Sequence, residues 1–158
     1  MVAPKGEPSC IFCVASRSKS TRQTLTLLKT GSALVMLNRY PYTNGHLMVA
    51  PLMHAASLFE TPPETLSHVM RLAAEAQRIL SETFRPDGFN IGMNFGHVAG
   101  AGFAEHYHMH IVPRWSGDVN FMSVTAGTRL VPEDLDATLE RLRPKFRRLR
   151  KAFPESDE

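Results

Sequence analysis

The stretch His106-Tyr107-His108-Met109-His110-Ile111-Val112, followed by Pro113, decides the fold of this chain. Its histidines alternate strictly with bulky apolar residues, and successive side chains of an extended strand point to opposite faces of a sheet. The pattern therefore predicts a strand on which three imidazoles share one face, roughly 6–7 Å apart, while the apolar residues enter a core. Imidazole acts as a proton-transfer group, a nucleophile or a metal ligand, so three on one face indicate a functional site.

Four more strands are predicted upstream of this stretch. Residues 25–28 and 33–37 are two apolar runs that flank the glycine-containing turn 29–32, which is the pattern of a hairpin. Residues 46–50 form a third apolar segment, closed by Pro51, and 89–94 form a fourth. Because the connections between the segments are short, antiparallel pairing is favoured.

Two helices are predicted on either side of the histidine stretch. The first spans residues 61–85, where apolar residues recur at helical spacing and Thr61 with Glu64 would form a capping box. The second begins at Pro132, and Pro144 is expected to break or kink it. The polar residues 16–23 are expected to form a turn or loop.

These elements predict an α+β fold: an antiparallel sheet of about five strands with one long helix and a C-terminal helix. The length of 158 residues fits a single domain, 1–158, with a core that needs no disulfides. Residues 1–9 and 151–158 are expected to be a flexible N-terminus and a flexible C-terminal tail.

Composition indicates a cytoplasmic protein that does not bind membranes. No apolar run approaches the length of a membrane span, and residues 1–9 lack the apolar segment of a secretory signal. The net charge is only +3, but basic residues crowd the last helix and its tail: Arg141, Arg143, Lys145, Arg147, Arg148, Arg150 and Lys151. They could attract polyanions or form a solvated face balanced by nearby acidic residues. Because no aromatic residues are interleaved to stack bases, we expect no nucleic-acid partner.

The only two cysteines lie in the C-x-x-C segment Cys10-Ile11-Phe12-Cys13. Such spacing fits a redox pair, a disulfide or half of a zinc site, and two buried free thiols are the remaining alternative. No pattern of a thioredoxin-like unit surrounds it. Because zinc takes four tetrahedral nitrogen or sulfur ligands, a tight C-x-x-C can supply two of them, and we favour this interpretation.

The stretch 106–112 resembles the signature of the histidine-triad (HIT) nucleotide hydrolases and transferases. The segments 37–42 and 45–51 resemble the nucleotide-binding strand and turn of that family. Residues 87–94 and 113–118 are similar to the branch that contains diadenosine tetraphosphate phosphorylases and hydrolases. The resemblance implies a HIT-like fold and a homodimer with a continuous sheet.

The resemblance also implies catalytic roles. Cleaving a phosphoanhydride takes an in-line nucleophile and donors that neutralise the charge on the phosphate oxygens. By resemblance His108 is the nucleophile and forms a covalent nucleotidyl-histidine, which water or phosphate then attacks. His110 would donate to a phosphate oxygen or the leaving group, and His46 would orient the triad.

Three further positions match residues that bind the nucleotide in relatives. Asn38 corresponds to a position that contacts the ribose hydroxyls, and Asn94 to one that contacts the phosphate chain. Gly102 stands where many relatives carry a glutamine or serine that holds the leaving phosphate. The backbone N–H of Gly102 can still donate to phosphate, and His97 or Ser123 are candidates to replace the missing side chain.

The family also suggests a base pocket and a metal site. Ile11, Phe12, Met36 and Met48 match positions that flank the base in relatives, although apolar residues at strand spacing fit a core equally well. The relatives with a C-x-x-C complete a structural zinc site with two histidines. The four ligands would here be Cys10, Cys13, His54 and His106.

The leading hypothesis is an enzyme that cleaves dinucleoside polyphosphates, such as diadenosine tetraphosphate. The residues do not decide whether water or phosphate accepts the nucleotidyl group. A nucleoside phosphoramidase is a second possibility. A nucleotide-binding module with vestigial catalysis is a third, and an intact triad argues against it. A catalytic metal site built from the three histidines is a fourth.

Overall fold

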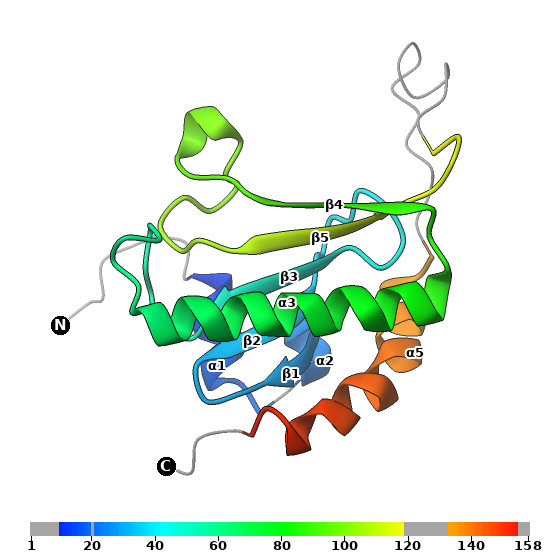
Figure 1. Ribbon diagram of the computed structural model, residues 1–158, viewed down its shortest axis with the longest axis horizontal. Coiled ribbons are helices and arrows are strands. Elements are labelled where there is room, and N and C mark those ends of the chain that lie inside the picture. Colours follow the sequence, from blue (N-terminus) through cyan, green and yellow to red (C-terminus); the bar gives the residue numbers. More distant parts are fainter. Residues whose placement is uncertain (1–9, 20, 119–132, 155–158) are drawn as a thin grey trace, which may run out of the picture.

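The computed structural model describes residues 10–19, 21–118 and 133–154 of the 158-residue chain (Figure 1). Five strands form one antiparallel sheet in the order β1-β2-β3-β5-β4. The strands are β1 (Thr26–Lys29), β2 (Ala33–Leu37), β3 (Leu47–Pro51), β4 (Gly88–Met93) and β5 (Met109–Arg114). The helices are α1 (Ile11–Arg17), α2 (Thr21–Thr24), α3 (Pro63–Phe84) and α5 (Leu135–Arg148), with 3₁₀ turns at His97–Ala99 and Leu149–Lys151. The predicted α+β fold is confirmed.

The two faces of the sheet carry two separate cores. On one face the sheet packs against the long helix α3, which lies in front of the sheet in Figure 1, and against α5. On the other face a smaller core gathers residues of α1, β2 and β3: Phe12, Ala15, Leu34, Met36, Met48 and Ala50. In β3 and β5, Val49 pairs with Met109 on the α3 face, and Met48 pairs with His110 on the α1 face. The histidines therefore lie on the α1 face.

The N-terminal segment is helical where a loop was expected. Residues 16–17 complete α1, and α2 occupies 21–24, so the expectation of a loop over 16–23 is wrong. Phe12 and Ala15 are each 1% exposed and pack on the sheet. Burial of this face stabilises α1 although its sequence carries no capping side chain.

Both long helices begin differently from the prediction. The first residue of α3 is Pro63, preceded by Pro62, and the Thr61 hydroxyl donates to the Ser57 carbonyl instead of capping the helix. The last helix begins at Leu135, where the Asp134 carboxylate accepts the N–H of Ala137, and position 132 lies outside the described residues.

Pro144 lies inside α5, which continues to Arg148, so the expected break is absent. Leu142 and Phe146, on either side of it, are fully buried against the sheet and α3. Burying two large apolar side chains is worth about 3–6 kcal/mol, enough to offset the roughly 3 kcal/mol cost of an interior proline.

The packed chain also continues past residue 151, where a flexible tail was expected to begin. Phe153 is buried in the main core, and the Pro154 carbonyl accepts the N–H of Gly31. Residues 155–158 lie outside the described residues, as do residues 1–9 and the segment 119–132. None of the described helices has the length and apolar character needed to cross a membrane.

The triad strand is shorter than predicted. Strand β5 starts at Met109, so His106 and His108 precede it, although His108 and His110 still lie on one face with their ring centroids 4.7 Å apart. The cause is a contact distant in sequence: the Tyr107 N–H donates to the Ala55 carbonyl at 2.8 Å instead of joining the β3 ladder.

Gly45 turns the chain into β3 immediately before His46. Its φ is +75°, and a Cβ there would lie 3.0 Å from Phe84 Cε2 and 3.1 Å from Leu80 Cδ2. We expect Gly45→Ala to lower the free energy of unfolding by about 2 kcal/mol, because it adds backbone strain to crowding. Urea denaturation measures this change. Gly102→Ala is the matched control, because a Cβ at Gly102 meets nothing within 4 Å; equal stabilities of the two variants would contradict the prediction.

Candidate active site

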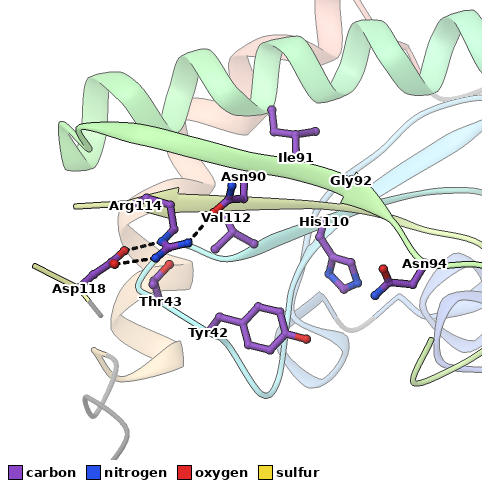
Figure 2. Close-up of a pocket in the computed structure, with 10 residues that line it drawn as sticks. All are labelled: Tyr42, Thr43, Asn90, Ile91, Gly92, Asn94, His110, Val112, Arg114 and Asp118. Atoms are coloured by element: carbon purple, nitrogen blue, oxygen red, sulfur yellow. Dashed lines mark hydrogen bonds and ion pairs between the residues drawn. The ribbon is translucent and has the colours of Figure 1, made fainter. Parts of the chain in front are cut away.

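Two cavities open on the α1 face of the sheet and meet at the triad. The first, of about 570 Å³, we call the α1 cavity; its lining includes Ile11, Met36, Asn38, Met48, Gly102 and His108. The second, of about 500 Å³, we call the β4 groove; its lining includes Asn90, Gly92, Asn94, Val112, Arg114 and Asp118 (Figure 2). Tyr42 and His110 line both cavities. His110 therefore stands at the junction of the two cavities, and His108 lines the α1 cavity beside it.

His108 is held in a defined tautomer by the backbone. Its Nδ1–H donates to the carbonyl of His106 at 3.0 Å. The hydrogen is on Nδ1, so Nε2 keeps a lone pair, and the side chain lines the α1 cavity. Phe12 packs against the ring with centroids 4.7 Å apart. His108 therefore has the features of an oriented imidazole nucleophile.

His46 sets the tautomer of His110. The backbone N–H of Tyr42 donates to His46 Nδ1 at 3.2 Å, which places the hydrogen of a neutral His46 on Nε2. This Nε2–H lies 2.9 Å from His110 Nδ1 and donates to it. The hydrogen of His110 is then on Nε2, where it is available to a ligand at the junction of the cavities. His46 is thus hydrogen-bonded to the third histidine of the triad, and its orienting role stays a prediction.

Burial keeps these imidazoles neutral. It lowers the pKa of His46 to about 3, helped by the neighbouring His110 and His108. It lowers the pKa of His110 to about 4, with a smaller contribution from His108. The pKa of His108 is also lowered by burial, although its hydrogen bond to the His106 carbonyl opposes the shift. At neutral pH each of these imidazoles is therefore neutral, with one nitrogen that donates a hydrogen bond and one that accepts.

The depressed pKa of His46 predicts a pH-dependent stability. Between pH 6.5 and about 3 the unfolded chain binds a proton at this position and the folded chain does not, so stability falls as the pH falls. The loss from His46 between pH 7 and pH 5 is about 2 kcal/mol. The His46→Gln side chain can still donate to His110. We expect the free energy of unfolding of this variant to fall by about 2 kcal/mol less between pH 7 and pH 5 than that of the unmodified protein. Urea denaturation at the two pH values measures it, and identical losses would contradict the expectation.

A second cluster of side chains surrounds the first histidine of the triad and consists of Cys10, Cys13, His54 and His106. One ligand atom from each lies within 4.8 Å of the others. Cys10 Sγ lies 3.3 Å from His106 Nδ1, and Cys13 Sγ lies 3.3 Å from His54 Nδ1 and 3.7 Å from His106 Nδ1. These four residues can hold a metal ion, as the sequence predicted. A bound cation would also stabilise the Cys10 thiolate, whose pKa is raised by burial.

The candidate metal-binding cluster is connected to His108 through His106. The Nε2–H of His106 donates to the Pro51 carbonyl at 2.9 Å, which leaves Nδ1 as a ligand atom facing the cysteines. The carbonyl of the same residue accepts the Nδ1–H of His108. Among the described residues the candidate metal-binding group contains His106 but neither His108 nor His110, so a catalytic metal site built from the three triad histidines is not supported.

The expected nucleotide-binding residues divide between the cavities. Asn38 and Gly102 line the α1 cavity, whereas Asn94 lies beside His110 in the β4 groove. Nothing lies within 4 Å of a Cβ at Gly102, so this position leaves space in the cavity. His97 lines neither cavity, and Ser123 lies outside the described residues.

The apolar positions suggested as a base pocket have mixed roles. Ile11 is 48% exposed and lines the α1 cavity. Met36 and Met48 line the same cavity while belonging to the smaller core. Phe12 is not among the lining residues; its ring lies against the rings of His106 and His108.

Comparison with known proteins identifies the family. The sequence profile of the HIT domain matches residues 19–117. The chain belongs to the HIT family. A relative named AP-4-A phosphorylase from Mycobacterium tuberculosis is 36% identical to this HIT protein over 129 residues, 82% of this chain. The match spans 66% of that relative, just under two thirds of its length.

Two further proteins resemble the chain over nearly their whole length. The adenosine 5′-monophosphoramidase of Schizosaccharomyces pombe is 27% identical, with 88% of this chain and 99% of the relative covered. The crystal structure of a zinc-bound histidine triad family protein from Mycobacterium smegmatis superposes with a TM-score of 0.71 at 29% identity. That match covers 91% of this chain and 97% of the other.

The sequence interpretation missed two features of the site. Tyr42, in the loop before β3, stacks on His46 and lines both cavities. Arg114 follows the triad and is bound to Asp118 and Asn90 in the β4 groove. Both residues lie in segments that resemble the family, 37–42 and 113–118. Their place in these segments could have identified them.

Proposed function

We propose that this HIT protein cleaves dinucleoside polyphosphates, such as diadenosine tetraphosphate, through a nucleotidyl intermediate on His108. The observation that carries the proposal is the hydrogen bond from His108 Nδ1–H to the His106 carbonyl. It fixes a neutral imidazole with a free lone pair in the α1 cavity, beside the junction at His110, as in-line attack on phosphorus requires.

The steps follow from the tautomers. His108 Nε2 attacks the phosphorus of the nucleotide held in the α1 cavity, and the bond from that phosphorus to the bridging oxygen breaks. The leaving oxygen takes the electron pair, and the His110 Nε2–H donates to it. The imidazolium formed at His108 keeps its Nδ1–H on the His106 carbonyl. Water or phosphate then attacks the same phosphorus, the bond from phosphorus to His108 Nε2 breaks and its electron pair returns to Nε2. A proton of an attacking water passes to solvent.

The similarity to the AP-4-A phosphorylase favours diadenosine tetraphosphate as substrate and phosphate as the second acceptor. Incubation of the protein with diadenosine tetraphosphate, with and without phosphate, tests this. ATP plus ADP indicates phosphorolysis, whereas ATP plus AMP, or two ADP, indicates hydrolysis. Absence of turnover in both conditions would contradict the proposal.

A phosphoramidase activity is the second candidate. It is favoured by the S. pombe relative, which this chain covers almost completely. The same His108 attack would expel an amine in place of a nucleotide. Turnover of adenosine 5′-monophosphoramidate at a kcat/KM above that for diadenosine tetraphosphate would favour this alternative.

We propose that the metal of the Cys10, Cys13, His54 and His106 cluster is zinc. A tetrahedral zinc ion with bonds of about 2.3 Å to sulfur and about 2.0–2.1 Å to nitrogen separates these ligand atoms by about 3.5 Å. The observed sulfur–nitrogen distances of 3.3 to 3.7 Å agree with this arrangement. Four protein ligands leave no open position, so the role would be structural.

We further propose that the protein is a cytoplasmic homodimer. Strand β4 ends the sheet and leaves a backbone edge at which a second copy could continue it. Ile91 on this strand is 43% exposed. Paired cysteines used as metal ligands rather than a disulfide fit a reducing compartment. Light scattering that gives the mass of a single chain at micromolar concentration would contradict the dimer.

A further inference from the structure

The β4 groove is a second binding space that the attack at His108 does not require. It adjoins the α1 cavity at Tyr42 and His110, and it extends from His110 along β4 and β5 to Arg114 and Asp118 (Figure 2). Its volume of about 500 Å³ lies within the range of about 300–1,000 Å³ that is usual for small-molecule sites. A substrate bound by one end in the α1 cavity would pass His110 and enter this groove.

Strand pairing makes room at the floor of the groove. Gly92 pairs with His110, and Asn90 pairs with Val112, so all four share one face of the sheet. A Cβ at Gly92 would meet nothing within 4 Å, and the position beside His110 is therefore open. Any other residue at position 92 would project a side chain into this space.

The far end of the groove carries polar groups whose charges cancel. Arg114 donates to both carboxylate oxygens of Asp118, at 2.5 and 2.7 Å, and to Asn90 Oδ1 at 2.6 Å. Because the guanidinium is already paired with a carboxylate, this end of the groove favours a neutral polar group over a free anion such as phosphate.

An aromatic wall completes the groove near the triad. Tyr42 packs one ring face on His46, with centroids 4.9 Å apart and planes 26° from parallel. The residue is 62% exposed. An exposed aromatic ring beside an open glycine position and neutral polar groups is a surface that suits a nucleobase and its ribose.

We propose that the β4 groove binds the leaving nucleoside of a dinucleoside polyphosphate while the α1 cavity holds the nucleotide that is transferred. This inference rests on the proposed function and assigns the second half of the substrate to Gly92, Asn90, Tyr42 and the Arg114–Asp118 pair. The groove would thereby favour substrates with two nucleosides over those with a small leaving group.

The test compares two substrates that give the same adenylyl group and differ in the leaving group: diadenosine tetraphosphate and adenosine 5′-phosphosulfate. We expect Gly92→Val to lower the ratio of kcat/KM for the first to that for the second by about tenfold. Gly88→Val is the matched control, because Gly88 lies on the same strand, meets nothing within 4 Å and does not line the groove. An unchanged ratio in Gly92→Val, or an equal fall in Gly88→Val, would overturn the inference.

A binding measurement separates this inference from the proposed reaction. In a His108→Ala background, adding Gly92→Val is expected to weaken calorimetric binding of diadenosine tetraphosphate about tenfold more than binding of AMP. Asn90→Ala, at an exposed position, should shift the same ratio in the same direction. Equal losses for both ligands would overturn the groove assignment even if His108 is the nucleophile. If the unmodified protein turns over neither substrate, the proposed function fails.

Discussion

Replacing His108 by alanine is expected to lower kcat for diadenosine tetraphosphate by about 10³-fold or more, with little change in folding. In the proposed reaction the side chain supplies the nucleophile, and its removal leaves only the weaker attack of unassisted water or phosphate. Initial rates with saturating substrate measure the effect, and thermal unfolding checks that the fold is kept.

The control for this experiment is His97→Ala. His97 is exposed, belongs to a short 3₁₀ turn and lines neither cavity, so its loss should leave kcat within about twofold. A His108→Ala protein that retains a tenth or more of the activity would refute the role given to this residue.

Replacing Cys13 by alanine is expected to abolish stoichiometric metal binding and to lower the free energy of unfolding. The loss should be about 3–4 kcal/mol at a metal concentration 100- to 1,000-fold above the dissociation constant, because the ion binds only the folded chain. Metal content by elemental analysis and urea denaturation measure the two effects, and removal of the metal from the unmodified protein with a chelator should reproduce both.

The same variant should also lose about tenfold in kcat, because in the proposed site His106 would hold the metal through its ring while its carbonyl accepts the Nδ1–H of His108. His97→Ala again serves as the control, since it removes an exposed histidine outside the cluster. Full metal content in the Cys13→Ala protein would contradict the ligand assignment. Unchanged stability after complete removal of the metal would contradict its structural role.

Local periodicity was sufficient to predict most of the fold. The continuous apolar runs in 33–37 and 46–50 indicate strands buried on both faces, and the helical spacing of 61–85 indicates a helix buried on one face. The helix over 11–17 was missed because its stability comes from packing of Phe12 on the sheet, a contact distant in sequence. The start of strand β5 at Met109, later than predicted, has the same kind of cause: the hydrogen bond from the Tyr107 N–H to the Ala55 carbonyl.

The candidate site could likewise be predicted only in part. The histidines and cysteines could be predicted because their residue types restrict the chemistry and their spacing matches a known signature. The β4 groove could not, because it depends on strand register: Gly92 opens space only because β4 pairs it with His110. The residue pattern of one sequence does not reveal which residues of two separate strands lie opposite each other.

Mass spectrometry of the protein quenched during turnover tests the central claim most directly. The reaction with diadenosine tetraphosphate is stopped at neutral to alkaline pH, digested and searched for a peptide that carries one adenylyl group. The account predicts this group on His108 and its absence from the His108→Ala protein. An adduct on His46 or His110, or turnover without any adduct on an imidazole, would contradict it.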